Sequence, residues 1–158
     1  MEIEEYLNSL ENNLMFGAGR WVADFSESFR NFKIGGRTFD LYMRGGVRPK
    51  GVFLSRIFAA FTLPNYEVAF YAMRVPEDGF DLDEILKTVA ERSKTAGAEW
   101  TWLLLLRNGA FPEKIAKRVE NFGEPRIGLA LGDIAAGDFN ASSNVLGRKA
   151  LSLIRVAK

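Results

Sequence analysis

A short apolar run near the middle of the chain constrains the fold more than any other feature. The seven residues from Trp100 to Leu106 carry no charge, and only Thr101 among them has a hydroxyl group. Turn-forming residues bound the run, with Gly97 before it and Asn108-Gly109 after it. This pattern predicts that residues 99–107 form a strand covered on both faces, as in a parallel sheet. The run is too short to cross a bilayer.

The segments around this run predict alternating strands and helices. Strand-forming residues occupy 67–75 and 127–131, on either side of the run in sequence. The segment from Asp81 to Gly97 starts with a capping residue and ends with a glycine, which predicts a helix. The segment from Pro112 to Gly123 starts with a residue favoured at the first helical position, which predicts another. The resulting order along the chain, a strand, a helix, a strand, a helix and a strand, predicts a parallel βαβαβ unit with right-handed crossovers.

The first half of the chain predicts helices followed by an antiparallel part of the sheet. Leucines at a three-to-four spacing predict an amphipathic helix over residues 3–14, and the spacing from Trp21 to Phe29 predicts a second helical stretch. Gly35-Gly36 between two strand-forming segments predicts a β-hairpin. Residues 52–63 fit a strand or a helix. We favour a strand that pairs antiparallel with the next one through a turn at Leu63–Tyr66.

The C-terminal part predicts a turn, a short strand and a last helix. The turn runs from Asp133 to Asp138 and leads into a strand around Phe139, and Asn144 is expected to cap a helix that continues through Ile154. Together these expectations describe one α/β domain over residues 1–158. Its sheet is mixed, with an antiparallel N-terminal part and a parallel βαβαβ C-terminal part, and helices cover both faces.

Two residue types that many enzymes use are missing from the chain. Without Cys, the chain cannot form disulfides, thiolate metal sites or Cys nucleophiles. Without His, it cannot form a Ser-His-Asp triad or a His-containing zinc site. The remaining chemistry is that of carboxylates with Mg²⁺ or Mn²⁺, or of a perturbed Lys, and no other cofactor is expected. The absence of Gln is a weak sign of a thermophilic protein, against which nine Asn residues stand.

Basic residues gather between residues 16 and 56, where eight Lys and Arg side chains stand against three acidic ones in a chain of net charge +1. Basic side chains interleaved with aromatic rings suit single-stranded nucleic acid, because rings stack on bases and cations follow phosphates. An ordinary solvated surface is the simpler account of the same residues. The candidates for nucleic-acid binding are Arg20, Trp21, Arg37, Tyr42, Arg44, Arg48, Lys50 and Arg56.

Four acidic residues are candidates for a catalytic or ligand site. Glu67 begins an otherwise apolar strand, where a partly buried carboxyl group suits acid–base chemistry, and Asp40 lies on a nearby predicted strand. Asp133 and Asp138 follow the C-terminal end of a predicted parallel strand, where open α/β sheets bind ligands. A solvated strand end for Glu67, and local turn hydrogen bonds for Asp133 and Asp138, are the simpler accounts.

Pro64-Asn65 and Glu67-Val-Ala69 stand, in the predicted order of elements, where one known family carries its catalytic motif. The order resembles that of the restriction-endonuclease-like PD-(D/E)xK superfamily over about residues 1–131. The resemblance implies a core of a helix, an antiparallel three-stranded meander, a helix and a strand parallel to its neighbour. It also implies a metal-dependent nuclease site, in which acidic side chains hold Mg²⁺. Asn65 and Ala69 replace the acid and the lysine of the motif, so the implied site is degenerate.

Three functional hypotheses follow from these observations. The first is a soluble, cytoplasmic, non-catalytic protein that acts as a homo-oligomer through a binding or self-association surface, with Phe53, Phe58 and Phe61 as candidate contacts. The second is a nucleic-acid-binding protein with a degenerate nuclease-like fold. The third is a carboxylate-dependent Mg²⁺ or Mn²⁺ nuclease that uses Asp40 and Glu67. The acidic N-terminus has no secretory pattern, and no membrane partner is expected.

Overall fold

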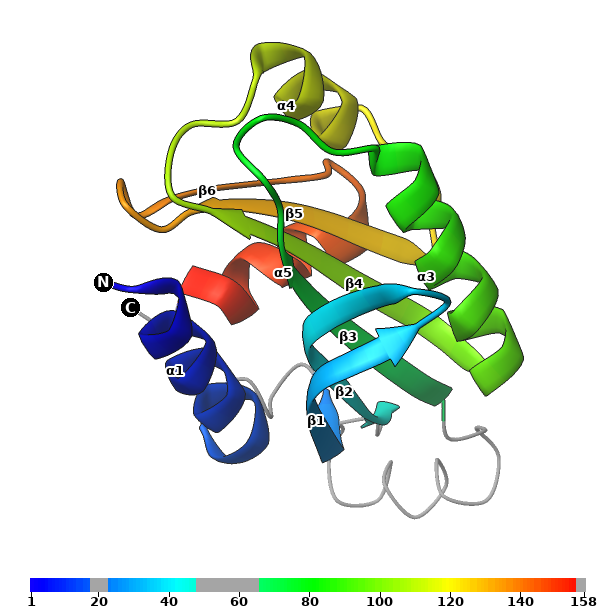
Figure 1. Ribbon diagram of the computed structural model, residues 1–158. Coiled ribbons are helices and arrows are strands. Elements are labelled where there is room, and N and C mark those ends of the chain that lie inside the picture. Colours follow the sequence, from blue (N-terminus) through cyan, green and yellow to red (C-terminus); the bar gives the residue numbers. More distant parts are fainter. Residues whose placement is uncertain (18–22, 48–65, 156–158) are drawn as a thin grey trace.

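The described part of the chain forms a six-stranded mixed sheet with helices packed against it (Figure 1). The computed structural model describes residues 1–17, 23–47 and 66–155. Its helices are α1 (Ile3–Phe16), α3 (Leu82–Ala96), α4 (Glu113–Glu120) and α5 (Val145–Arg155). Its strands are β1 (Asp24–Ile34), β2 (Arg37–Val47), β3 (Tyr66–Arg74), β4 (Ala98–Arg107), β5 (Ile127–Asp133) and β6 (Asp138–Ala141). None of these helices is long and apolar enough to cross a membrane.

The strands lie side by side in the order in which they occur in the sequence. β1, β2 and β3 form an antiparallel meander. β3, β4 and β5 pair in parallel, with α3 and α4 between them in the chain, and β6 returns antiparallel to β5. The expected mixed sheet, antiparallel in its N-terminal part and parallel further on, is therefore confirmed.

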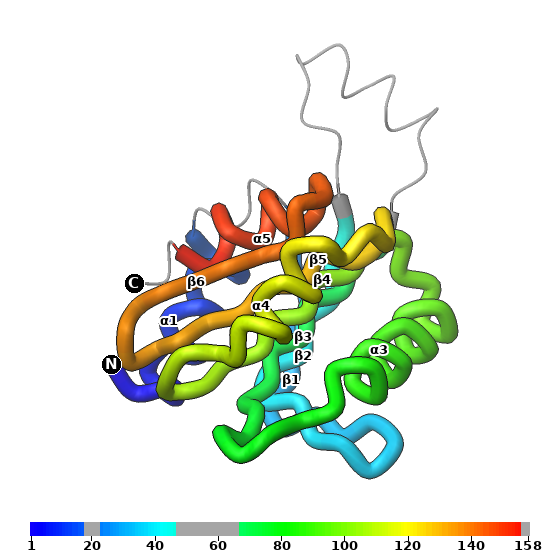
Figure 2. The backbone as a smooth tube through the Cα atoms, turned by 90° about the horizontal axis from the view of Figure 1, so that it is seen from above, coloured from blue at the N-terminus to red at the C-terminus, as the bar shows by residue number. Residues whose placement is uncertain are grey.

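Each face of the sheet carries its own apolar core. α1 and α5 pack on one face, through residues such as Leu7, Leu10 and Leu153, and α3 and α4 pack on the other, through residues such as Ile85 and Val119. Figure 2 shows α1 and α5 together on one side of the sheet and α3 on the opposite side. The expectation that helices cover both faces is therefore confirmed.

β4 contributes buried side chains to both cores, as the apolar run predicts. It is paired with β3 on one side and β5 on the other, and its residues from Thr101 to Leu106 are buried. Because side chains alternate along a strand, Trp102, Leu104 and Leu106 enter the α1–α5 core, whereas Leu103 and Leu105 enter the α3–α4 core. A strand enclosed in this way has no polar face, which is why the run contains almost no polar residue.

The helix boundaries follow the predicted capping residues. The Asp81 carboxylate accepts a hydrogen bond from the Glu84 amide at 3.2 Å, and Gly97 ends α3 in the left-handed conformation with φ 75°. The Asn144 side chain accepts from the Gly147 amide at 2.8 Å at the start of α5. Pro112 is the capping residue before α4 and not its first helical residue, and the helix ends at Glu120, before the predicted stop.

The predicted helical stretch from Trp21 to Phe29 is wrong for the part that the structure describes, because Asp24–Ile34 is strand β1. A spacing of four residues fits one face of a helix, and it misled the prediction here. The register of β1 against β2 shifts between Phe25 and Glu27, which marks a bulge. The extra residue places Phe25 in the α1–α5 core and leaves Phe29 on the opposite face of the sheet.

The predicted β-hairpin at Gly35-Gly36 is confirmed, and both glycines have positive φ, 54° and 78°. The preceding segment that was predicted to pair with β3, residues 52–63, lies outside the described residues, as does Pro64-Asn65. The antiparallel partner of β3 among the described strands is β2.

Candidate functional site

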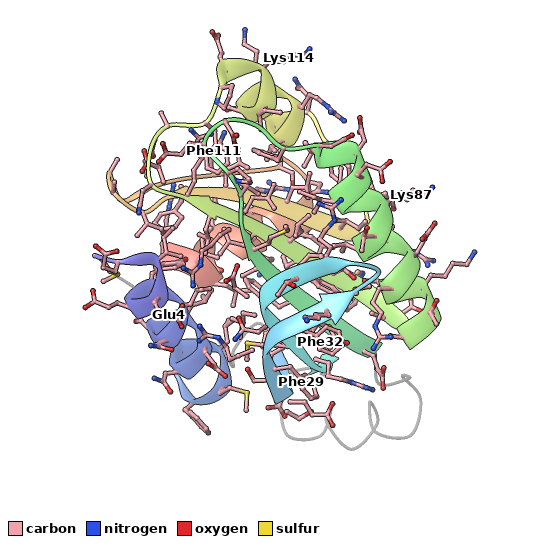
Figure 3. The ribbon with its side chains drawn as sticks, in the orientation of Figure 1. Glu4, Phe29, Phe32, Lys87, Phe111 and Lys114 are labelled. Carbon is pink, nitrogen blue, oxygen red and sulfur yellow. The ribbon has the colours of Figure 1, made fainter. Side chains whose placement is uncertain are left out.

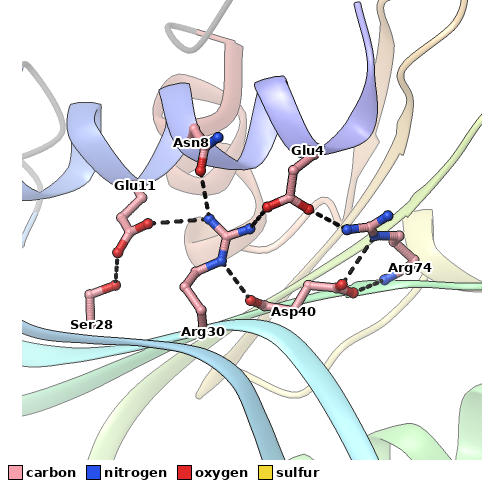
Figure 4. A network of polar contacts seen from close by, with 7 residues as sticks. All are labelled: Glu4, Asn8, Glu11, Ser28, Arg30, Asp40 and Arg74. Atoms are coloured by element: carbon pink, nitrogen blue, oxygen red, sulfur yellow. Dashed lines mark hydrogen bonds and ion pairs between the residues drawn. The ribbon is translucent and has the colours of Figure 1, made fainter.

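A network of charged side chains joins α1 to the β1–β2–β3 meander (Figure 4). At its centre, the Arg30 guanidinium on β1 contacts carboxylates of Glu4 and Glu11 on α1, and it donates to the Asn8 side chain at 2.9 Å. Arg74 on β3 contacts the other oxygen of the Glu4 carboxylate. Glu4 therefore lies between two arginines, and the network ties the N-terminal helix to three strands.

An irregularity in the β1–β2 pairing positions Asp40 in this network. The register pairs Arg30 with Leu41 and Phe32 with Phe39, and it passes over Asn31 and Asp40. Asn31 has φ 52°, a left-handed conformation that asparagine tolerates better than most residues. The Asp40 carbonyl accepts instead from Arg30 Nε at 3.0 Å. Arg30 thus bonds to the β2 backbone at the position that the register passes over.

Both oxygens of the Asp40 carboxylate accept hydrogen bonds from Arg74. One of its oxygens accepts from the Arg74 amide at 2.8 Å, and the other accepts from Arg74 Nε at 3.0 Å. A carboxylate held by an arginine in this way is poorly placed to bind a cation, because the guanidinium already neutralises it. Among the described residues, no group of three or more acidic side chains is arranged to hold a metal ion. The network is best explained as a set of polar contacts that hold α1 against the sheet. We call it the clasp, and it consists of Glu4, Glu11, Arg30, Asp40 and Arg74.

The structure does not bring the two catalytic candidates together. Glu67 is paired with Gly46 in the β2–β3 register, whereas Asp40 precedes the Leu41–Ala72 pair. Six residues of β2 therefore separate the two positions, about 20 Å at the rise of a β-strand. Glu67 is exposed and lies 3.6 Å from Arg44, far from the Asp40–Arg74 pair. The arrangement that carboxylate-dependent Mg²⁺ or Mn²⁺ chemistry requires is not formed by these two residues.

The two ligand-site candidates lie opposite each other in the β5–β6 hairpin. Asp133 is buried, and its Oδ1 accepts from the Gly109 amide at 2.9 Å and the Ala136 amide at 3.2 Å. It thus fixes the turn after β5 to the loop after β4. Asp138 is exposed at the start of β6. Local hydrogen bonds account for the position of Asp133 in the turn.

The nucleic-acid candidates are only partly described. Arg20, Trp21, Arg48, Lys50 and Arg56 lie outside the described residues. Arg37 is half-buried beside the hairpin turn, and Arg44 on β2 contacts Glu27 at 3.2 Å as well as Glu67. Tyr42 is only 2% exposed, so its proposed role as a platform for stacking bases is wrong.

Tyr42 is buried because two phenylalanines of β1 cover it. Phe32 stacks on Tyr42 with ring centroids 4.6 Å apart, and Phe29 stacks on it at 5.8 Å. Phe29 is 41% exposed, and Phe32 is half-buried. Both phenylalanines carry labels on the β1–β2 pair in Figure 3. We call Phe29, Phe32 and Tyr42 the ring cluster, and Phe29 is its most exposed member.

One cation from α3 borders the ring cluster. The guanidinium carbon of Arg92 lies 5.5 Å from the centroid of the Phe32 ring, a cation–π contact. The Nε of Arg92 and the hydroxyl of Tyr71 beneath it are both buried and have no hydrogen-bond partner among the described residues. Burial raises the pKa of Tyr71 to about 12, and nearby Ser93 and Arg92 act in the opposite direction to a smaller extent.

The ring cluster lies at an edge of the sheet. β1 has eleven residues, and β2 is its only strand neighbour among the described elements. The opposite edge strand, β6, has four residues. A long edge strand offers unpaired backbone donors and acceptors, so it is a template for another strand unless it is protected. β1 contains no proline and one lysine, Lys33.

Sequence reasoning missed Phe29, Phe32 and the edge position of β1. Phe29 was assigned to a helical stretch and Phe32 to the first strand of the hairpin, and the bulge that turns Phe29 to the face opposite Phe25 leaves no mark in the composition. The usable signal was the polar residue on each side of Phe29 and the apolar–polar–apolar order Phe32-Lys33-Ile34 next to the predicted hairpin. That alternation is typical of a half-buried strand.

Comparison of this chain with protein-family models, with curated proteins and with solved structures finds no match.

Proposed function

We propose that this is a soluble, cytoplasmic protein without catalytic activity that acts through a self-association surface. The surface is made of the outer edge of β1 and the exposed part of the ring cluster. It differs from the phenylalanines considered from the sequence, Phe53, Phe58 and Phe61, which lie outside the described residues.

The exposed aromatic ring on a long edge strand is the single observation that carries this proposal. Phe29 presents 41% of its surface to solvent at an edge where the strand has no second neighbour among the described strands. Aromatic side chains are enriched at protein interfaces, and a strand edge adds backbone hydrogen bonds to the apolar contact. The polar clasp on the other face of β1 is internally paired, so it offers less to a partner.

Replacing Phe29 by lysine is expected to weaken self-association by about tenfold or more, because it puts a charge at the centre of the apolar contact. The matched control is Phe16→Lys, since Phe16 is 75% exposed at the end of α1 and is not part of the ring cluster. Sedimentation velocity over a wide range of protein concentrations measures both. A wild-type protein that remains monomeric at high concentration would contradict the proposal. Equal weakening by both substitutions would show that exposed rings aggregate without a defined site.

A second candidate function is nucleic-acid binding. The order α1, β1, β2, β3, α3, β4 and its pairing agree with the core that the nuclease-like resemblance implies, which supports this alternative. We also infer right-handed crossovers through α3 and α4, which would give the βαβαβ unit expected from the sequence. Phe29 then serves as the stacking ring, beside Arg44 and Arg92. We rank this candidate second because Arg44 is already ion-paired with the carboxylates of Glu27 and Glu67 and is therefore less available to phosphates.

If the second candidate is correct, a labelled single-stranded oligonucleotide should bind at low salt, and its affinity should fall steeply as salt is added. Phe29→Ala should weaken this binding by about tenfold through lost stacking, whereas Phe16→Ala should leave it unchanged. Fluorescence anisotropy measures both effects. The absence of binding at low salt would exclude this function.

A further inference from the structure

We propose that the partner at this surface is a second copy of the chain, whose β1 pairs antiparallel with β1 about a two-fold axis at Phe29. The two six-stranded sheets would then form one continuous sheet. This inference rests on the proposed function, because it names the partner and the register of the same surface. Identical subunits most often associate through such self-complementary two-fold contacts.

The order of charges along β1 favours antiparallel pairing of this strand with itself. Asp24 and Glu27 precede Phe29, and Arg30 and Lys33 follow it. In an antiparallel pair centred on Phe29, the acidic half of each strand lies along the basic half of the other. A parallel pair in register would instead place like charges side by side, which is unfavourable.

The ring cluster is completed by the same symmetry. A two-fold axis at Phe29 places the two Phe29 rings directly opposite each other on the face that carries Phe32 and Tyr42. Within one chain, Phe29 and Phe32 have ring centroids 5.7 Å apart, and both pack on Tyr42. The exposed portion of Phe29 would thus be covered by its counterpart, and the two clusters would join into one apolar strip. Directly opposed aromatic pairs are among the favourable cross-strand contacts.

On the other face of β1, the pairing introduces no unpaired charge. Ser28 of one copy would lie opposite Arg30 of the other. Both side chains already bond to Glu11 of their own chain, Ser28 as a hydrogen-bond donor and Arg30 through an ion pair at 3.3 Å. No like charges are therefore directly opposed on this face, and the two Arg30 side chains, which lie diagonally across the axis, are each already ion-paired with Glu4 and Glu11 of their own chain.

The irregularities of β1 limit the paired segment to its centre. The bulge lies between Phe25 and Glu27, and the left-handed residue is Asn31. Pairing about Phe29 uses Glu27 to Asn31 of each copy, the segment that starts after the bulge and ends at the left-handed residue. A register displaced by one residue would bring Phe29 opposite a residue of the clasp face, since side chains alternate along a strand.

The register can be measured with spin labels, because the chain has no cysteine of its own. Single variants Glu27→Cys, Lys33→Cys and Asp138→Cys place labels at exposed positions before Phe29, after it and on the far edge strand. With about 3.3 Å per residue, the expected Cα separations across the axis are about 14 Å for position 27 and about 27 Å for position 33. Position 138 should lie about 50 Å or more from its counterpart.

Electron paramagnetic resonance distances that increase from position 27 to position 33 and then to position 138 support the proposal. Short separations at both 27 and 33 would indicate parallel strands and overturn it. A short separation at 138 would place the interface at β6 and overturn it while leaving self-association intact.

Amide hydrogen exchange of the unmodified protein provides a second measurement, in which residues 27–31 should exchange about tenfold more slowly in the associated form. Association without added protection in β1 would also overturn the proposal. A strictly monomeric protein would remove the proposed function together with it.

Discussion

Replacing Gly147 by alanine is expected to lower the free energy of unfolding by about 3 kcal/mol or more, as overpacking of a rigid contact does. Alanine is normally the better helix former by about 1 kcal/mol, so propensity alone predicts the opposite sign inside α5. The difference is the space available. A Cβ atom at this position would lie 1.9 Å from the carbonyl oxygen of Ser142 and 2.3 Å from its hydroxyl oxygen.

Ser142 has little freedom to move away. Its amide donates to the Leu129 carbonyl at 2.9 Å, and its hydroxyl accepts from the Leu129 amide at 3.1 Å. That hydroxyl also donates to the Asn144 side chain at 2.8 Å. Relief of the clash would therefore require α5 to shift away from β5 and β6, and the α1–α5 core would lose contacts.

The matched control for this substitution is Gly123→Ala. A Cβ atom at Gly123 would have no neighbour within 4 Å, and no positive φ restricts the position. Urea unfolding followed by tryptophan fluorescence should separate the two variants clearly, with Gly123→Ala close to the unmodified protein. Equal stability of both variants would mean that α5 does not approach Ser142 as closely as the structure indicates.

The elements that the sequence predicted well are those whose signals are local. The apolar run of β4 needs cover on both faces wherever it lies in the sheet, and Asp81, Gly97 and Asn144 act on helix ends only a few residues away. The turn at Gly35-Gly36 is likewise set by the conformational freedom of two adjacent glycines. Local chemistry of this kind can be inferred without knowledge of the fold.

The arrangement around β1 could not be predicted in the same way. The bulge after Phe25 and the left-handed Asn31 depend on how β1 meets β2 and α1, and nothing in the local pattern specifies them. Arg30 appeared as one basic residue among many, whereas it bonds α1 and the Asp40 carbonyl. Asp40 and Glu67 both lie on the meander, as expected, but only the register places them far apart.

Alkaline solution is expected to destabilise the fold through two buried tyrosines. Tyr6 lies in the α1–α5 core with its hydroxyl donating to the Ile154 carbonyl at 3.1 Å, and Tyr71 lies in the α3–α4 core. Burial raises the pKa of Tyr71 to about 12 and that of Tyr6 further still, because the phenolate would lose its hydration. In the unfolded chain, both groups ionise near pH 10.

The sign of the effect follows from proton binding. The folded state holds the phenolic protons more tightly, so both tyrosines contribute fully below about pH 10, and their contribution is lost as pH rises through the folded-state pKa values. Between pH 10 and the folded-state pKa values, each tyrosine proton lowers the free energy of unfolding by about 1.4 kcal/mol per pH unit. The free energy of unfolding should thus be about 2 to 3 kcal/mol lower at pH 11 than at pH 9.

The Tyr6→Phe, Tyr71→Phe double variant isolates this contribution, because lysines and exposed groups titrate alike in both proteins. Tyr6→Phe removes the hydrogen bond to Ile154 and should lower stability at every pH, whereas Tyr71→Phe removes a buried hydroxyl without a partner among the described residues and should cost little. The informative quantity is the change in unfolding free energy between pH 9 and pH 11, measured by urea titration at each pH. A double variant that loses as much stability over this range as the unmodified protein would show that the two hydroxyls reach water in the folded state.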